Sequence, residues 1–491
     1  LALSNEPDTL DSARTIDIAA LFIIQNTMEG LVSLDPHLNP TPAAAESWSV
    51  SEDQRTFTFR LREDAKWSDG ISLEAKHFVA AWRRAIAPET ASQTAYLLYP
   101  IENAEKIQKG ELPPQSLAVR ALDERTLEVN LQYPSATFLK TLSQPISFPV
   151  RMDIIEKRGE RWFEPPHAIS NGPYTLSEWQ HDYKAVLLAN KFYSGKAPSI
   201  EKAEIFFVED HATSLSLFES GKIDIASIPF DHWERVQKSP LVHRSSNLAT
   251  TFMVFNLHRP PFDQVAVRKA FSLAIDSSLL SKVTRGRGLP IETILPLELT
   301  DPQGAVRLSY NPGKAKKSWE EAGHLSHSSP YLIGSNGGED YKTVLEWLQH
   351  EWKEKLGVIT SIETSEWKVY FQRLKNDNPY PIYRFGWQAA VADPTDFLAL
   401  FQSDNPNNFS GWNNPRYDAL VREVSHLPIG ERRRRLVQEA LKILLQEEVV
   451  ALPLYNFTRH RLIQPWVKGY WANGQGPCPL RDLSLADDAT H

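Results

Sequence analysis

Strand-like and helix-like segments alternate along this chain, and that alternation limits the folds it can adopt. Residues Arg55–Arg62 alternate apolar and polar side chains, as a half-buried strand does. Phe78, Val79 and Trp82 then recur at helical spacing. The same order of strand and helix continues to about residue 455. Such alternation is typical of the α/β class, so we expect an α/β fold.

The second half of the chain carries the stronger signals. Residues Thr251–Asn256 are almost continuously apolar, which predicts a strand in the centre of a sheet. A helix is predicted over residues 265–275 with Asp263 as its N-cap, and another over 340–356 that ends at Gly357. Asn311 marks a further helix start.

Composition excludes several classes of protein. A single cysteine, Cys478, excludes a disulfide framework, a thiolate zinc site and an iron–sulfur cluster. The 53 basic and 61 acidic side chains give a net charge of −8, which argues against a nucleic-acid partner. No run of 18 apolar residues exists, so no membrane span is expected. We expect neither a metal nor a cofactor, and the 491 residues suggest about three domains.

Catalytic motifs are absent or incomplete. The chain has no G-x-S-x-G motif, and His350–Glu354 places Glu where a zinc-protease motif needs its second histidine. Ser365–Lys368 matches S-x-x-K without the companion motifs of serine acyl-transferring enzymes. The arginine run Arg432–Arg435 lies among glutamates on a predicted helix, as a solvated face does. We therefore expect no catalytic residues, and binding becomes the leading functional class.

Three long stretches resemble the signatures of one protein family. They are Ala45–Gly70, Phe255–Ala270 and Phe385–Phe397, and they occur in the family's order. With smaller matches they cover nearly the whole chain. The chain is thus similar to the family 5 extracellular solute-binding proteins, which are the oligopeptide- and dipeptide-binding proteins of ABC importers.

The resemblance implies a two-lobed periplasmic-binding-protein fold of type II, in its large three-domain variant with a discontinuous first domain. The lobe I domain is expected at residues 1–43, 166–257 and 459–491, and an inserted second domain at 44–165. The lobe II domain is expected at 258–458. Closure of the two lobes would bury the ligand and present the closed form to a membrane permease.

The resemblance also implies that an extended peptide pairs with strand edges while its side chains enter tolerant pockets. Residues Arg14–Ile18, Thr250–Val254 and Gly386–Ala389 match the family's peptide-pairing strands. The full predicted ligand-binding set is Thr15, Ile16, Asp17, Ile18, Thr251, Phe252, Met253, Trp367, Arg384, Gly386, Trp387, Gln388, Ala389 and Ala390.

Three of these residues carry specific roles in the resemblance. Trp367 and Trp387 match tryptophans that line side-chain pockets, with ordinary core packing as the alternative. Arg384 matches an arginine that reaches the ligand's C-terminal carboxylate. An arginine inside the apolar stretch Tyr383–Trp387 needs an anion, which a structural salt bridge could equally supply.

Ala390 departs from the family pattern. Peptide binders of this family commonly carry an aspartate three residues after the Gly-Trp tryptophan, and it pairs with the peptide's α-ammonium. A buried ammonium without a counter-charge is strongly disfavoured. Either another carboxylate pairs with it, with Asp17, Glu366 and Asp393 as candidates, or the ligand has no free α-amine.

The first interpretation is an extracytoplasmic solute-binding protein, monomeric and not an enzyme, that delivers an oligopeptide-like ligand to an ABC importer. The alternatives are a receptor for a modified peptide, muropeptide or oligosaccharide, and the ligand-sensing module of a regulator. The first residues lack the basic start and apolar block of a signal peptide. We therefore expect a targeting segment to be missing from this sequence, and a periplasmic or lipid-anchored protein.

Overall fold

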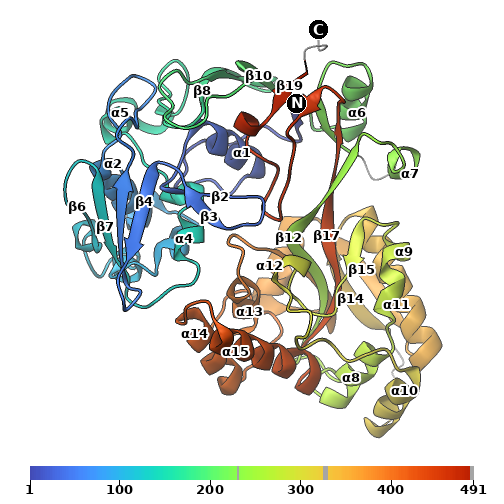
Figure 1. Cartoon of the computed structure of the whole chain (residues 1–491). Helices are drawn as coiled ribbons and strands as arrows, with labels where there is room; N and C mark the ends of the chain where they lie inside the picture. Colours follow the sequence, from blue (N-terminus) through green and yellow to red (C-terminus); the bar gives the residue numbers. More distant parts are fainter. Residues whose placement is uncertain (229–231, 324–329, 487–491) are drawn as a thin grey trace. The chain divides into compact units, whose positions relative to one another are not determined.

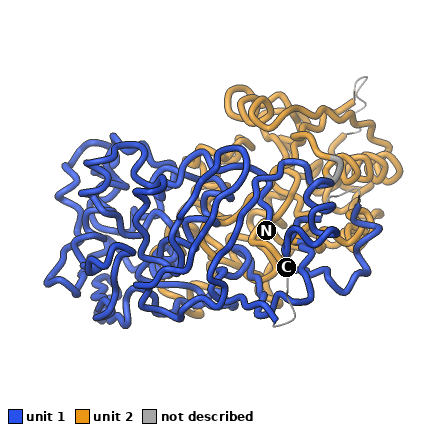
Figure 2. The backbone as a smooth tube through the Cα atoms, turned by 90° about the horizontal axis from the view of Figure 1, so that it is seen from above, with its two compact units in different colours: residues 1–244, 460–491 blue, residues 245–459 orange. Residues whose placement is uncertain are grey.

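The computed structural model describes residues 1–228, 232–323 and 330–486, the side chains of residues 339 and 340 excepted. The chain forms two compact units (Figure 2). Unit 1 comprises Leu1–Arg244 and His460–His491, and unit 2 comprises Ser245–Arg459. The chain enters unit 2 within strand β12 (Val242–Phe255) and leaves it within strand β17 (Ala451–Ile463) (Figure 1). The mixed strand and helix content confirms the α/β class.

Unit 1 contains two four-stranded sheets, in the orders β1-β10-β9-β8 and β4-β5-β7-β6. Strand β5 buries Phe57, Phe59 and Leu61 on one face, as its alternating sequence predicts. The elements are β1 (Ala2–Leu3), α1 (Ile18–Thr27), β2 (Val32–Leu34), β3 (Pro40–Pro42), β4 (Ala45–Val50), β5 (Thr56–Leu61), α2 (Ala75–Ile86), α3 (Ala104–Gln108), β6 (Val119–Ala121), β7 (Thr126–Asn130), α4 (Phe138–Thr141), α5 (Met152–Arg158), β8 (Tyr174–Gln180), β9 (Lys184–Ala189), β10 (Lys202–Phe207), α6 (His211–Glu219), β11 (Ile225–Ser227), α7 (Trp233–Val236), β18 (Val467–Lys468) and β19 (Ser484–Leu485).

Unit 2 is built on a sheet in the order β17-β12-β16-β14-β15, with β13 paired to β17. Strand β12 lies inside this sheet and its apolar run is buried, which confirms the predicted central strand. The remaining elements are α8 (Val265–Leu273), α9 (Leu280–Val283), β13 (Gly288–Pro290), α10 (Pro312–Glu321), β14 (Tyr331–Asn336), α11 (Glu339–Leu356), β15 (Thr360–Ser365), α12 (Trp367–Asp377), β16 (Ile382–Gln388), α13 (Thr395–Leu398), α14 (Pro415–Ser425) and α15 (Glu431–Lys442).

Most helix ends follow the predicted signals. Gly357 ends α11 in the left-handed conformation at φ 69°, and Asn311 caps α10 by accepting the Lys314 N–H. The N-cap of α8 is Gln264, so the prediction of Asp263 is wrong. The backbone turn from Pro261 to Gln264 moves the helix start one residue further along the chain. Among the described helices, none has the length and apolar character needed to cross a membrane.

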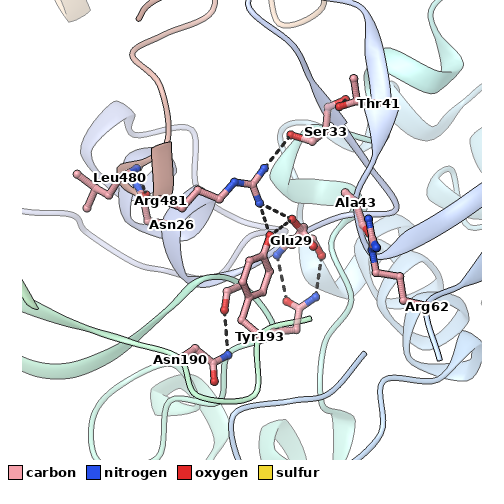
Figure 3. Close-up of polar contacts among 12 residues, drawn as sticks. Asn26, Glu29, Ser33, Thr41, Ala43, Arg62, Asn190, Tyr193, Leu480 and Arg481 are labelled. Carbon is pink, nitrogen blue, oxygen red and sulfur yellow. Dashed lines mark hydrogen bonds and ion pairs between the residues drawn. The ribbon is translucent and has the colours of Figure 1, made fainter. Parts of the chain in front are cut away.

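A buried polar network joins the N-terminal, middle and C-terminal parts of unit 1 (Figure 3). The Arg481 guanidinium lies 2.6 Å from the Glu29 carboxylate, and the Tyr193 hydroxyl donates to the same carboxylate at 2.6 Å. Asn171 exchanges two hydrogen bonds with the Glu29 backbone, at 3.1 and 2.8 Å. Losing any partner would leave a charge buried without compensation, so the network anchors the last segment of the chain in this unit.

We expect His77 to make the protein sensitive to acid. Its Nδ1 accepts the Glu74 N–H at 3.0 Å and the Trp67 indole N–H at 3.3 Å, at the start of α2. Burial lowers the pKa of His77 from 6.5 to about 4. Unfolding therefore takes up a proton between these pH values. The free energy of unfolding should fall as the pH drops through that window, by about 1–2 kcal/mol after allowance for partial exposure.

Urea unfolding at pH 7 and pH 4.5 measures this loss. The variant His77→Asn keeps an acceptor near Nδ1 but does not titrate, so it should lose about 1–2 kcal/mol less than the parent protein. The exposed His37→Asn is the matched control. An equal loss in all three proteins would contradict the assignment.

Candidate functional site

The predicted ligand-binding residues fall into two groups, one in each unit. Residues 15–18 belong to unit 1. The other ten lie in unit 2, on strand β12, helix α12, strand β16 and the loop that follows β16.

In unit 1, residues 14–18 do not form the predicted strand. The Asp17 side chain accepts the Ala20 N–H at 2.8 Å and caps α1, which begins at Ile18. It also accepts a hydrogen bond from Asn5 Nδ2 at 2.7 Å. A helix cap in this position stops strand geometry from continuing. Asp17 is thus occupied as a cap, which weakens its case as a counter-charge for an ammonium.

The remaining unit 1 candidates differ in exposure. Thr15 is buried, whereas Ile16 and Ile18 are 57% and 68% exposed. Two apolar side chains next to each other in solvent are unusual enough to suit a contact surface. This part of the prediction therefore stays open for Ile16 and Ile18.

In unit 2, Thr251, Phe252 and Met253 are each at most 1% exposed. Strand β12 has β17 on one side and β16 on the other. A ligand cannot join a strand that is interior to its sheet, so the predicted peptide pairing along Thr250–Val254 is wrong. These residues instead support β16.

Strand β16 turns alternate backbone groups away from β12. The Ala389 N–H donates to the Leu248 carbonyl at 2.8 Å, and β12 and β16 are antiparallel. Because bonded and non-bonded residues alternate in an antiparallel ladder, the backbone groups of Gly386 and Gln388 point to the other side of β16.

On that other side, the neighbouring strand separates early. Strand β14 pairs with β16 only as far as Tyr383. Beyond it, the buried Tyr370 hydroxyl lies 2.7 Å from the Arg384 carbonyl and 3.3 Å from the Gly334 carbonyl, between the separating strands. Among the described strands, none pairs with Gly386 and Gln388 on this side. The structure thus leaves a short open edge that an extended chain can join.

Arg384 lies beside this edge and is 5% exposed. Its Nη1 is 3.5 Å from Thr251 Oγ1, its Nη2 contacts Asn336 Oδ1, and its guanidinium carbon is 3.7 Å from the centroid of the Tyr341 ring. Its Nε is buried without a hydrogen-bond partner. No carboxylate among the described side chains forms a salt bridge with it. The salt-bridge alternative is therefore wrong, and the cation still lacks an anion.

Gly386 makes room for that guanidinium. A Cβ atom at this position would lie 3.3 Å from Arg384 Nη1 and 3.3 Å from the Thr250 carbonyl oxygen. Both contacts are tighter than a normal side chain accepts. A glycine here lets the guanidinium lie over the backbone of the open edge.

The two predicted pocket tryptophans are only partly buried, so ordinary core packing does not describe them. Trp367 is the first residue of α12 and is 48% exposed, with its ring centroid 5.4 Å from that of Phe371. Trp387 is half-buried, and its indole N–H donates to Asp396 Oδ1 at 3.1 Å. Both can present an aromatic face to a ligand.

The other two carboxylates considered as counter-charges have structural partners. Glu366 caps α12 by accepting the Lys368 N–H at 2.9 Å. Asp393 forms a buried ion pair with Arg433 at 2.7 Å and accepts the Thr395 N–H at 2.9 Å. Neither carboxylate is left without compensation.

Asp396 was not predicted from the sequence, yet its carboxylate lies at the end of β16. It accepts the backbone N–H groups of Ala390 at 2.8 Å and Val391 at 3.1 Å, in addition to the Trp387 indole. Burial raises its pKa above the ordinary value, and these three hydrogen bonds partly oppose that shift. No described cation forms a salt bridge with it. The only sequence signal was its position six residues after Ala390.

Replacing Tyr370 by Phe should destabilise unit 2, because the variant leaves the buried Arg384 carbonyl without its hydroxyl donor. We expect a loss of about 1–2 kcal/mol in the free energy of unfolding, measured by urea denaturation. Tyr310→Phe, at a residue 38% exposed, is the control and should change stability little. Equal effects of the two substitutions would contradict a special role for the Tyr370 hydroxyl.

Known proteins resemble the chain over its full length. The profile of the bacterial extracellular solute-binding proteins, family 5 Middle, matches residues 39–409. The probable deoxycholate-binding periplasmic protein YgiS of Escherichia coli (strain K12) is 30% identical over 478 residues, which cover 95% of this chain and 89% of YgiS. The dipeptide-binding protein DppE of Bacillus subtilis (strain 168) is 31% identical over 497 residues, which cover 98% of this chain and 90% of DppE.

A solved structure agrees with these relatives. The unliganded open form of MppA, a periplasmic murein tripeptide binding protein of Escherichia coli, superposes with a TM-score of 0.84 at 28% identity. The superposition covers 100% of this chain and 97% of MppA.

Proposed function

Because this chain belongs to the bacterial extracellular solute-binding proteins of family 5, we propose that it captures an oligopeptide-like ligand outside the cytoplasm and delivers it to an ABC importer. One observation carries the proposal: the open edge of β16 at Gly386 and Gln388 lies next to the uncompensated guanidinium of Arg384. A backbone edge and a cation together suit a chain that ends in a carboxylate.

The backbone of the ligand supplies most of the recognition in this mechanism. A peptide that joins β16 donates to and accepts from the main chain of Gly386 and Gln388, whatever its side chains are. Its terminal carboxylate pairs with Arg384, whose planar guanidinium offers several N–H groups in a fixed arrangement. Trp367 and Trp387 border the spaces for its side chains.

We also propose that the protein acts as a monomer, without catalytic activity, metal or cofactor, and that it has no nucleic-acid partner. Its relatives are periplasmic binding proteins, so it acts outside the cytoplasm. Whether the mature form is soluble or lipid-anchored follows from a targeting segment, and we propose that one precedes residue 1.

The predicted division into three domains is likewise a proposal. The sheet β4-β5-β7-β6 lies within residues 44–165, which supports an inserted second domain inside unit 1. The first domain then consists of 1–43, 166–257 and 459–491, and the lobe II domain of 258–458.

Arg384→Gln should weaken the binding of peptides with a free C-terminal carboxylate by at least about tenfold, because a charge-assisted pair is lost. Peptides with an amidated C-terminus should bind with little change. Titration calorimetry of both forms of one peptide measures the difference, with the 55% exposed Arg422→Gln as the matched control. Equal losses for the acid and the amide would place the carboxylate elsewhere.

Native mass spectrometry of the purified protein tests the ligand class directly. We expect a series of peptide masses that dissociate on gentle activation, one ligand per chain. A single sterol or sugar-containing mass would contradict an oligopeptide ligand. It would favour the alternative of a ligand without a free α-amine.

A further inference from the structure

Unit 2 holds two charges of opposite sign along one strand, and neither has a counter-charge among the described residues. Arg384 is the cation and Asp396 the anion. We propose that Asp396 receives the ligand's α-ammonium, so that with Arg384 it selects short peptides whose two ends are both charged. This inference rests on the proposed function and narrows it to a substrate class.

The Asp396 carboxylate has capacity for one more donor. Its Oδ2 accepts the Ala390 and Val391 N–H groups, and its Oδ1 accepts only the Trp387 indole. An ionised carboxylate offers about four acceptor positions, so at least one remains on Oδ1. The three present donors are neutral and hold the carboxylate in place without cancelling its charge. A partly exposed anion held in this way suits an incoming ammonium.

The nearby ionic groups leave Asp396 as the charge in this position. Asp393 is already neutralised by Arg433 at 2.7 Å. Ala390 has no charge of its own, and the Asp396 carboxylate oxygen lies 2.8 Å from its backbone nitrogen. The negative charge at the end of β16 is therefore supplied from the start of α13, six residues further along the chain.

The positions of the two charges limit the length of the ligand. The Arg384 guanidinium lies over Gly386, because a Cβ there would be 3.3 Å from Nη1. From residue 386 to residue 390 an extended strand covers at most about 13 Å. A peptide spans up to about 3.3–3.6 Å per residue, so about four residues are the upper limit. Its N-terminus faces Asp396 and its C-terminus faces Arg384, so it runs antiparallel to β16.

The test compares the peptide Ala-Phe-Ala with its N-acetylated form by titration calorimetry. The parent protein should bind the free-amine peptide at least about tenfold more tightly. Asp396→Asn should remove that preference by weakening the free-amine peptide about tenfold and leaving the N-acetyl peptide unchanged. Asp404→Asn, on a side chain 71% exposed in the same unit, is the control and should keep the preference.

A second variant protects the test against misfolding. Ala390→Asp, introduced together with Asp396→Asn, returns a carboxylate to the end of β16 and should restore the preference. Equal losses for both peptides in Asp396→Asn would show a purely structural carboxylate and overturn the proposal. So would the absence of any free-amine preference in the parent protein.

Ligand length separates this inference from the proposed function. If native mass spectrometry shows only peptides of six or more residues, and Ala-Phe-Ala does not bind, the short zwitterionic ligand is overturned while peptide transport stands. If the protein neither retains nor binds any peptide, the proposed function itself fails.

Discussion

The separation of two strands from a common start is the constraint on which the candidate site depends. Strand β16 is bonded to β12 along its whole length, which fixes its position in the sheet. Its other neighbour, β14, pairs with it at only two residues and then diverges. A strand held firmly on one side and released on the other presents a rigid, unpaired backbone. Edges of this kind usually attract other chains, and proteins protect them or use them.

The charges around that edge follow the same logic. A buried ion without a partner is expensive, so a folded protein tolerates one only where something else supplies the partner. Arg384 is held by Asn336, Thr251 and the Tyr341 ring, none of which carries a negative charge. Asp396 is held by N–H groups that carry no net charge. Both ions are oriented before a ligand arrives, which reduces the ordering cost of binding.

Unit 1 shows how a discontinuous chain is held together. The carboxylate of Glu29 near the start, the Tyr193 hydroxyl in the middle and the Arg481 guanidinium near the end meet in one buried network. Because each partner satisfies another, removing one would cost more than the net value of a single hydrogen bond. Asp17 plays a similar local role, since its carboxylate starts α1 and leaves Ile18 exposed.

The sequence by itself determined the class of fold, the family, and most element positions, because periodicity and caps are local properties. It predicted β5, the buried β12, the Asn311 cap and the end of α11 at Gly357, and it identified Arg384 as a cation in apolar surroundings. It failed where an edge or a partner depends on distant residues. Thr250–Val254 has the composition of a strand, but only the sheet order shows that β16, and not β12, has an open side. Likewise, Ala390 pointed to a missing charge, while only the loop between β16 and α13 brings the Asp396 carboxylate to that place.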